Sequence, residues 1–266
     1  MVREKPSSIA IYILMLVALI ACKNRNQSNT TSIDPQSKND GFVSIFDGKT
    51  LNDWVGDPTY WSVENGNLTG TITPETLLSN NTFIIWQGGE PSNFELKLEY
   101  RINEDGNSGI NYRSEPLDTI PYALRGYQAD IDGKNSYTGQ NYEERKRTTL
   151  AYQGEKVNVN PLAGLKRKGS LTTNIEKNAW KNREVTKSLG SKDSLLAYIK
   201  KDDWNQVHLT VKDNRMKHYV NGILMSDVTD NDAINRSESG KIGVQVHVGP
   251  PMKVEFRDIR LKAILD

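Results

Sequence analysis

The feature that most constrains this chain is a two-residue alternation of apolar and polar side chains in several short segments. Residues 94–102 read FELKLEYRI, which places Leu96, Leu98 and Tyr100 on one face and charged side chains on the other. Residues 204–212 alternate in the same way. Because successive side chains of a β-strand point to opposite faces, each segment is predicted to be a strand with one buried face.

Turn residues connect these segments, and no long amphipathic helical pattern separates them. Asp213-Asn214 and Asn221-Gly222 are two-residue turn candidates, which predict two successive hairpins. Further strand-like runs cover residues 240–248 and 252–263. The sequence therefore predicts an all-β fold, in which two antiparallel sheets pack as a sandwich.

The composition excludes two classes of protein. The chain has 34 Lys and Arg against 33 Asp and Glu, so its net charge of +1 gives no bulk attraction for nucleic acid or another polyanion. Its single cysteine excludes a disulfide framework within the chain. The length of 266 residues suits one large all-β domain behind its N-terminal segments.

One stretch departs from the strand pattern. Residues 138–203 contain many Lys, Arg, Asn and Ser and few aromatic residues, including the basic runs at 145–147 and 166–168. Two interpretations stand. The stretch is either a solvated insertion on the surface, or a long inserted loop that folds over one face of the sandwich and supplies site residues.

The N-terminus is predicted to be a lipoprotein signal peptide, residues 1–21. Arg3 and Lys5 precede an almost purely apolar run over residues 9–21, which is shorter than the about 20 residues that a membrane-spanning helix needs. The run ends in Leu-Ile-Ala-Cys at Cys22, which is similar to the bacterial lipobox. The alternative is an ordinary cleaved signal with a stray cysteine, but the one cysteine stands where lipidation needs it.

The residues after the cysteine suggest where the protein is held. Residues 22–40 are polar and lack aromatic residues, which predicts a flexible tether to a folded domain over residues 41–265. Lys23 stands where inner-membrane retention would require an aspartate. We therefore expect a protein anchored by lipid in a bacterial cell envelope, on the outer membrane and facing the periplasm.

Several segments, in their order and spacing, resemble one protein family. They read FVSIFDGKTLNDW (42–54), WSVENGNLTG (61–70), FELKLEYRI (94–102), NSGINYR (107–113), GYQADI (126–131), YTGQNYEER (137–145), GKIGVQVHVG (240–249) and VEFRDIRL (254–261). Over residues 42–261 the sequence is similar to the 3-keto-disaccharide hydrolase domain, which is common in secreted and lipid-anchored bacterial proteins.

The resemblance implies a concanavalin A-like jelly roll and a glycosidase of the hydrolase or lyase type. Such an enzyme hydrolyses 3-keto-disaccharides, or acts by elimination and hydration through a 3-keto-2-hydroxyglucal. A ketone at C3 acidifies the proton on C2, so a base can remove it and the enolate can expel the group at C1. This chemistry needs a general base, a general acid, and donors or a metal ion for the oxyanion. No organic cofactor is implied, and a divalent metal stays open.

Strand alternation selects candidate residues without reference to the family. In GVQVHV, Val244 and Val246 fall on one face, and Gln245 and His247 fall on the other. A polar pair beside a valine row indicates a solvated sheet face. His247 is the leading acid/base candidate, because imidazole titrates nearest neutral pH, and a surface histidine is the alternative.

A second candidate group lies in GYQADID, where Gln128, Asp130 and Asp132 share a face. Asp130 is the best carboxylate for base or acid, with Glu99 as a partner, and a capping or ion-pair role is the alternative. The spacing of Asp130 and Asp132 could also ligate a metal. Without further ligands, we assign no metal site.

Arginines and aromatic residues complete the expected site. In NSGINYR, Asn111 and Arg113 share a face, and Arg113 is predicted to stabilise an enolate or a sugar oxygen, with an ion pair to Glu95 or Glu99 as the alternative. The first residues of the insertion are predicted to close over the sugar. The expected catalytic residues are His247, Asp130 and Arg113; the expected substrate-binding residues are Gln128, Gln245, Asn111, Glu99, Tyr142, Glu143 and Arg147.

Further sequence features help to distinguish between the possible functions. Trp54, Trp61 and Trp86 could stack on sugars, but core positions are the preferred interpretation. The sequence lacks the Glu-x-Asp-x-x-Glu motif of related glucanases and any dinucleotide fingerprint that leads a strand into a helix, so it should not oxidise C3 itself. The alternatives to an enzyme are a non-catalytic carbohydrate-binding module and a structural envelope lipoprotein.

Overall fold

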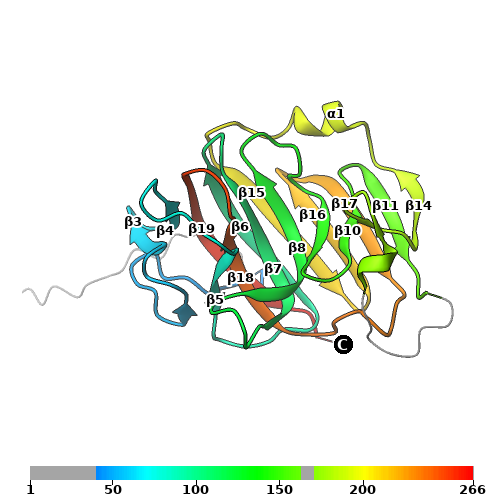
Figure 1. Ribbon diagram of the computed structural model, residues 1–266, viewed down its shortest axis with the longest axis horizontal. Coiled ribbons are helices and arrows are strands. Elements are labelled where there is room, and N and C mark those ends of the chain that lie inside the picture. The colour runs from blue at the N-terminus through cyan, green and yellow to red at the C-terminus, as the bar shows by residue number, and fades with distance from the viewer. Residues whose placement is uncertain (1–39, 163–170, 266) are drawn as a thin grey trace, which may run out of the picture. The chain divides into compact units, whose positions relative to one another are not determined.

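The computed structural model describes residues 40–162 and 171–265, which fold as two packed β-sheets (Figure 1). In these residues the first sheet is 10-stranded. Its order is β14 (Arg183–Ser188), β11 (Glu155–Val159), β17 (Ile223–Asp230), β16 (Arg215–Val220), β15 (Asn205–Lys212), β6 (Phe94–Ile102), β19 (Met252–Ala263), β4 (Asn67–Ile72) and β3 (Trp61–Glu64), with β1 (Val43–Ser44) pairing with β19.

The second sheet is 9-stranded in the same residues. Its order is β12 (Ile175–Glu176), β13 (Ala179–Trp180), β10 (Thr148–Ala151), β9 (Asn141–Glu144), β8 (Leu124–Asp132), β7 (Asn107–Pro116), β18 (Lys241–Val246), β5 (Thr82–Trp86) and β2 (Trp54–Val55). The helical elements described are the 3-10 helix η1 (Thr172–Asn174) and the short helix α1 (Lys192–Leu196). The prediction of an all-β jelly-roll sandwich is confirmed.

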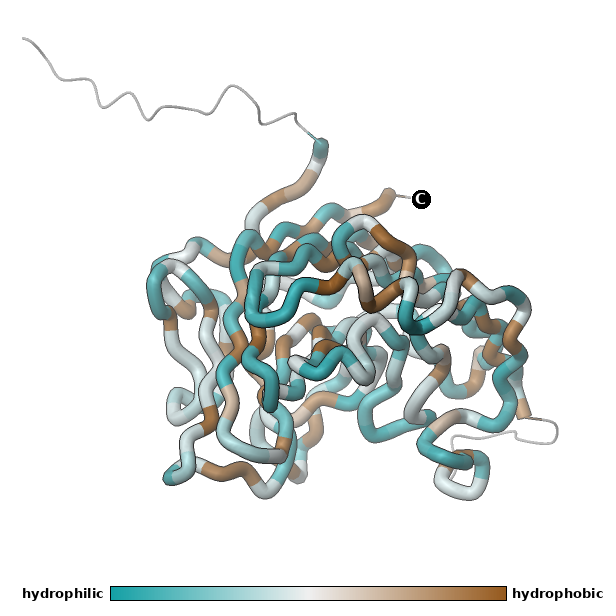
Figure 2. Tube along the Cα trace, turned by 90° about the horizontal axis from the view of Figure 1, so that it is seen from above, coloured by the Kyte–Doolittle hydropathy of each residue, from teal (hydrophilic) through white to brown (hydrophobic). Residues whose placement is uncertain are grey.

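The alternating segments form the strands that the sequence predicts. β6 alternates buried and half-buried residues along its whole length. Both predicted hairpin turns have left-handed backbone, with φ of 52° at Asp213, 49° at Asn221 and 80° at Gly222, as primed turns require. In the hydropathy-coloured trace of Figure 2, brown and teal positions alternate along much of the chain.

The core lies between the two sheets and is rich in aromatic residues. Phe94 of the first sheet contacts Tyr112 of the second edge-on, with ring centroids 6.1 Å apart, and Tyr112 stacks on Tyr127 at 5.6 Å. Trp54 and Trp61 are buried in this core, as preferred above, and Trp86 is half-buried against it. Because the core takes one face of each strand of the second sheet, the opposite face of β7, β8 and β18 is left for a site.

Residues 138–203 are not an inserted loop, which corrects one expectation. Their described parts form β9 to β14, so they extend both sheets. They also add parallel pairs, β10 with β13 and β11 with β17, to sheets expected to be antiparallel. The hydrophobic alternation is weak here because polar residues such as Asn141, Glu143 and Arg147 fill buried positions.

The predicted signal peptide, Cys22 and nearly all of the predicted tether lie outside the described residues. Within the described part of the chain, we find no helix with the length and hydrophobicity needed to cross a bilayer.

Candidate functional site

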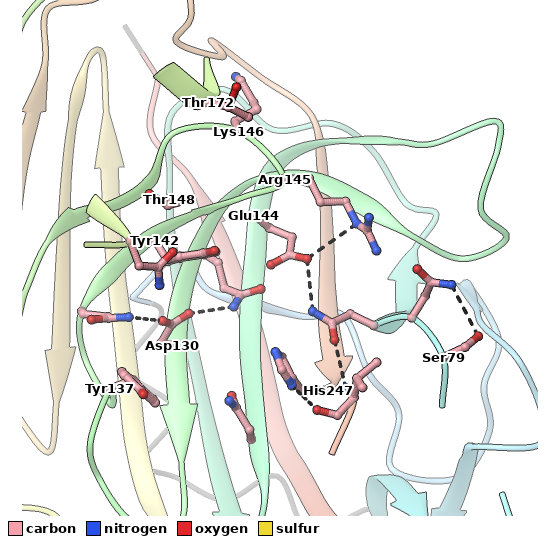
Figure 3. Close-up of a pocket in the computed structure, with 17 residues that line it drawn as sticks. Ser79, Asp130, Tyr137, Tyr142, Glu144, Arg145, Lys146, Thr148, Thr172 and His247 are labelled. Atoms are coloured by element: carbon pink, nitrogen blue, oxygen red, sulfur yellow. Dashed lines mark hydrogen bonds and ion pairs between the residues drawn. The ribbon is translucent and has the colours of Figure 1, made fainter. Parts of the chain in front are cut away.

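A cavity of about 750 Å³ opens on the outer face of the second sheet. Its walls come from β8, β9, the end of β18 and the loop before β5 (Figure 3). The lining includes Asn81, Asn107, Gln128, Asp130, Tyr137, Gln140, Tyr142, Glu144, Arg145 and His247. Figure 3 shows Asp130, Glu144 and His247 around the same pocket. Three titratable side chains from three segments of the chain therefore meet in one place.

Strand register brings these side chains together. Gln128 of β8 lies opposite Tyr142 of β9, and the next pair on the same face is Gly126 with Glu144. On the other side of β8, Gly109 of β7 lies opposite Asp130. A Cβ on Gly109 would stand 2.4 Å from the side chain of Gln128, so glycine at this position makes room for the floor of the cavity.

Asp130 is nearly buried, and two side-chain amides hold its carboxylate. It is 8% exposed, and its two oxygens accept hydrogen bonds from Gln128 Nε2 at 2.7 Å and Gln140 Nε2 at 2.5 Å. Burial raises the pKa of Asp130 to about 7, although both amide bonds act in the opposite direction and the Glu144 carboxylate adds to the rise. Asp130 therefore exchanges a proton near neutral pH, as a general acid or base must.

The backbone that carries Gln140 is anchored from the core. His218 of the first sheet contacts the Gln140 carbonyl through Nδ1 at 3.2 Å and Tyr112 Oη through Nε2 at 2.8 Å. Burial lowers the pKa of His218 to about 4, so the ring is neutral at pH 7. A neutral ring satisfies both contacts when Nδ1–H donates to the carbonyl and Nε2 accepts from the tyrosine.

Glu144 is the second buried carboxylate of the cavity. Its Oε1 accepts from Asn81 Nδ2 at 3.2 Å and lies 3.7 Å from Arg145 Nε. Burial raises the pKa of Glu144, while Asn81, Arg145 and His247 act to lower it. Glu144 and His247 therefore lie close enough to interact electrostatically.

His247 presents one ring nitrogen to the cavity. Its Nδ1 lies 2.6 Å from the carbonyl oxygen of Val248, and its backbone N–H donates to the carbonyl of Asn107. Because a carbonyl only accepts, Nδ1 carries a proton and Nε2 is left for a ligand. A fixed tautomer with a free Nε2 suits proton transfer.

A neutral donor and a network of side-chain amides complete the site. Burial, with Glu144 and Asp130 nearby, raises the pKa of Tyr142, so its phenol stays protonated and can donate. Beneath the cavity, Gln245 Nε2 donates to Gln128 Oε1 at 3.2 Å, which continues the chain of amides that ends on Asp130. Gln245 and Asn111 are themselves fully buried, so they support the floor instead of facing a ligand.

Arg113 and Glu99, both expected in the site, lie elsewhere. A register shift in β7 after Tyr112 and a φ of 45° at Arg113 turn its side chain away, and its guanidinium donates to the carbonyls of Ser92 and Asp213. Glu99 belongs to the other sheet, where its carboxylate accepts from Arg257 at 2.7 Å. Strand alternation predicts the wrong face for Arg113, because a bulge reverses the face to which the side chains after it point.

Glu143 and Arg147 are also absent from the cavity. Both are fully buried between the sheets and bind each other, at 2.5 Å between Arg147 Nε and Glu143 Oε2. Glu143 lies opposite Tyr127, whose side chain is in the core, so the cavity-facing carboxylate of β9 is its neighbour Glu144. Of this segment the structure brings Tyr142 to the cavity, and the glutamate that lines it is Glu144 instead of Glu143.

The Asp130/Asp132 pair does not form a metal site. The Asp132 carboxylate accepts backbone N–H groups of Ser136, Tyr137 and Thr138, which closes a turn and removes the Asp130/Asp132 pair considered from the sequence. Across residues 40–162 and 171–265, no group of three or more His, Cys, Asp or Glu could hold a metal ion. We therefore assign no step to a metal.

The cavity residues that sequence reasoning missed include Asn81, Gln140, Glu144 and Tyr137. Glu144 could have been found from strand parity, because it shares a face with Tyr142 two residues before it. Asn81 and Gln140 carry no such signal, since only long-range pairing brings their amides to Glu144 and Asp130.

Comparison with known proteins identifies the family. The profile described as the 3-keto-alpha-glucoside-1,2-lyase-like domain matches residues 41–262. The chain belongs to this family. A relative from Bacteroides thetaiotaomicron, named 3-keto-disaccharide hydrolase, is 31% identical over 108 residues, which are 38% of this chain and 37% of the relative. The match thus spans little more than a third of the relative's length.

Solved structures show which known folds this domain is similar to. Two solved Parabacteroides distasonis proteins, each named after the glycosyl hydrolases, superpose with TM-scores of 0.52 and 0.50. They are 18% and 16% identical; the first covers 85% of this chain and 94% of its own, the second 84% and 99%. At this identity the likeness establishes the fold alone.

Proposed function

We propose that this protein is a glycosidase that cleaves 3-keto-glycosides by acid/base chemistry at C2 and C1. The observation that carries the proposal is the meeting of Asp130, Glu144 and His247 in one polar cavity of a lyase-like family member. The names of the family and of the Bacteroides relative supply the substrate class.

The reaction we propose begins with elimination. A base removes the proton on C2, whose electrons form the C1=C2 bond as the C1–O bond breaks, and the leaving oxygen takes a proton from an acid. Water then adds across C1=C2, so that the sum is hydrolysis of the glycoside. This route needs only a base, an acid and donors for the enolate oxygen at C3.

The residues present fit these roles. Asp130, with a pKa of about 7, is ionised in part at neutral pH and is the base for C2. His247 offers Nε2 as the acid, with the Glu144 carboxylate close enough to interact with its ring. Tyr142 and Arg145 are the donors that line the cavity and can face the enolate oxygen.

The test is turnover of chemically prepared substrates. Purified protein is incubated with a 3-keto-disaccharide and with 3-keto-2-hydroxyglucal, with added divalent metal ions and with chelator, and products are followed by NMR. We expect release of the free sugar in both metal conditions. Unchanged substrates would overturn the proposal, and glycan binding that survives in Asp130→Ala and His247→Ala without any turnover would assign a carbohydrate-binding module instead.

Gln140→Ala is expected to move the pH profile. The hydrogen bond from Gln140 acts to lower the pKa of Asp130, so its loss raises that pKa from about 7 to a higher value. If Asp130 must be ionised to act as base, the acid limb of kcat/KM shifts to higher pH, while the limiting rate changes less. Profiles of both proteins from pH 5 to 9 measure this. Coincident acid limbs would contradict the role of Asp130.

We also propose that the chain is lipid-anchored at Cys22, as its N-terminal sequence predicts. Expressed with its full N-terminus in a Gram-negative host, the protein should partition with outer-membrane vesicles, and Cys22→Ser should shift it to the soluble or precursor fraction because no acceptor thiol is left. Metabolic labelling with an alkyne fatty acid reports lipidation directly. Equal labelling of both proteins would refute the assignment.

A further inference from the structure

A second cavity of about 320 Å³ adjoins the first. The two cavities share four lining residues, Asn107, Tyr137, His247 and Val248. A residue that lines both cavities stands at their boundary, so His247 lies where the two cavities meet. The Asp130 and Glu144 carboxylates line the first cavity and are absent from the described lining of the second.

The walls of the second cavity differ in chemistry. Val248, Pro250 and Met252 give it an apolar part, whereas Glu104, Asp105, Lys134 and Ser136 give it a polar part. Tyr137 at the junction is 49% exposed, more than any other aromatic side chain of the described residues except Tyr198. A pyranose has an apolar face and a rim of hydroxyls, and an exposed aromatic ring offers a stacking surface for such a face.

The second cavity offers no buried, unengaged carboxylate like those of the first. Of its carboxylates, Asp132 accepts three backbone N–H groups of a turn, Asp105 pairs with Lys134 at 3.0 Å, and Glu104 is exposed. Its volume lies at the small end of ligand pockets, which run from about 300 to 1,000 Å³, so it suits a single sugar ring. The polar part offers both donors and acceptors to hydroxyl groups.

We propose that the second cavity binds the leaving sugar of the substrate, while the first holds the 3-keto unit. This inference rests on the proposed function and adds the division of the substrate between the two cavities. The bond that is cut then crosses the junction, next to His247 Nε2, which assigns His247 to protonation of the leaving oxygen and leaves C2 to Asp130. The protein is therefore specific for glycosides whose aglycone is a sugar.

Substitution of Gly249 provides a direct test of the proposed subsite. It lines the second cavity, and a Cβ added to it would meet only the carbonyl oxygen of His247, at 4.0 Å. A side chain can therefore begin at this position without a clash, and Gly249→Trp is designed to occupy the second cavity. Lys134→Ala, at a side chain 61% exposed, removes a donor without risk to folding. Tyr198→Trp, at an exposed position away from both cavities, is the matched control.

The readout is the ratio of kcat/KM for a 3-keto-disaccharide to kcat/KM for methyl 3-keto-α-glucoside, whose aglycone does not reach the second cavity. We expect Gly249→Trp to lower this ratio at least ~10-fold and Lys134→Ala to lower it by a smaller factor, while Tyr198→Trp leaves it unchanged. An unchanged ratio in both cavity variants overturns the subsite and leaves the proposed function intact.

A binding measurement separates the two proposals. If the unmodified protein turns over neither substrate, the proposed function fails, and saturation-transfer NMR with maltose and methyl α-glucoside then decides the subsite alone. Weaker maltose binding in Gly249→Trp, with methyl glucoside binding retained, supports it. Equal loss of both ligands, or of neither, overturns it.

Discussion

Asp130→Asn is expected to lower kcat/KM on 3-keto-glycosides by about 10² to 10⁴-fold, the usual contribution of a general base. Asparagine keeps the shape of the side chain but cannot accept the C2 proton. Because the change acts on proton transfer, it should appear in kcat with little change in KM. Initial rates at pH 7, measured for the variant and the unmodified protein, test this.

The same substitution should stabilise the fold at alkaline pH. Unfolded aspartate titrates near 3.9, so between that value and about 7 the folded protein binds the extra proton. The stability associated with Asp130 is therefore fully present below about pH 4 and is lost as pH rises through about 7. Asparagine carries no charge, so it avoids this loss once the Gln140 side-chain amide has rotated to accept a hydrogen bond from the new amide N–H. Tm should therefore rise at pH 8 and change little at pH 4.

Glu115→Gln is the matched control, an acid-to-amide change in an exposed ion pair with Arg125. It should leave both kcat/KM and the pH dependence of Tm unchanged. Asp130→Asn that retains more than a tenth of the activity would remove Asp130 from the base role. A lower Tm at pH 8 would contradict the cause given for its raised pKa.

The parts of the fold that the sequence predicts are those with local hydrophobic alternation. The strand over residues 94–102 and the hairpins at 213–214 and 221–222 follow from patterns within a few residues, and the structure has them at those places. The strands between residues 138 and 203 carry no such pattern, because their buried positions hold amides and charges. Their places in the sheets depend on partners distant in the sequence.

The site residues divide in the same way, into those predicted by local alternation and those placed by pairing with distant strands. Gln128 and Asp130 share a cavity-facing side because they are two residues apart on one regular strand. The prediction for Arg113 is wrong because a bulge interrupts the regular register of its strand, and nothing in the sequence marks that bulge. That Glu144, and not Glu143, faces the ligand depends on the pairing of β9 with β8, which single-strand alternation does not supply.

Arg147→Ala is expected to destabilise the fold by about 3–5 kcal/mol, the cost of breaking a buried ion network. Arg147 is fully buried and donates to Glu143, Asp230 and Asp232, which are themselves fully buried. Tyr127 also donates to Asp230, at 2.6 Å. Removal of the guanidinium leaves three carboxylates in the interior, with Lys146 near one of them.

The pH dependence of this loss distinguishes charge from packing. Burial alone would raise the pKa of Glu143, but Arg147 and Lys146 hold it below the usual range, so its stabilising contribution is present above about pH 4 and is lost as pH falls. In Arg147→Ala the freed carboxylates take up protons instead. The difference in unfolding free energy between the two proteins should therefore shrink from pH 8 to pH 4.

Urea unfolding of both proteins at the two pH values measures this difference, with Arg125→Ala as the control. That arginine pairs with Glu115 on the exposed surface, so its loss should cost less than about 1 kcal/mol at either pH. Arg147→Lys restores the charge but not the fork that contacts three carboxylates, so it should recover only part of the stability. A loss in Arg147→Ala that equals the control, or that stays constant with pH, would show that packing and not charge makes Arg147 necessary between the sheets.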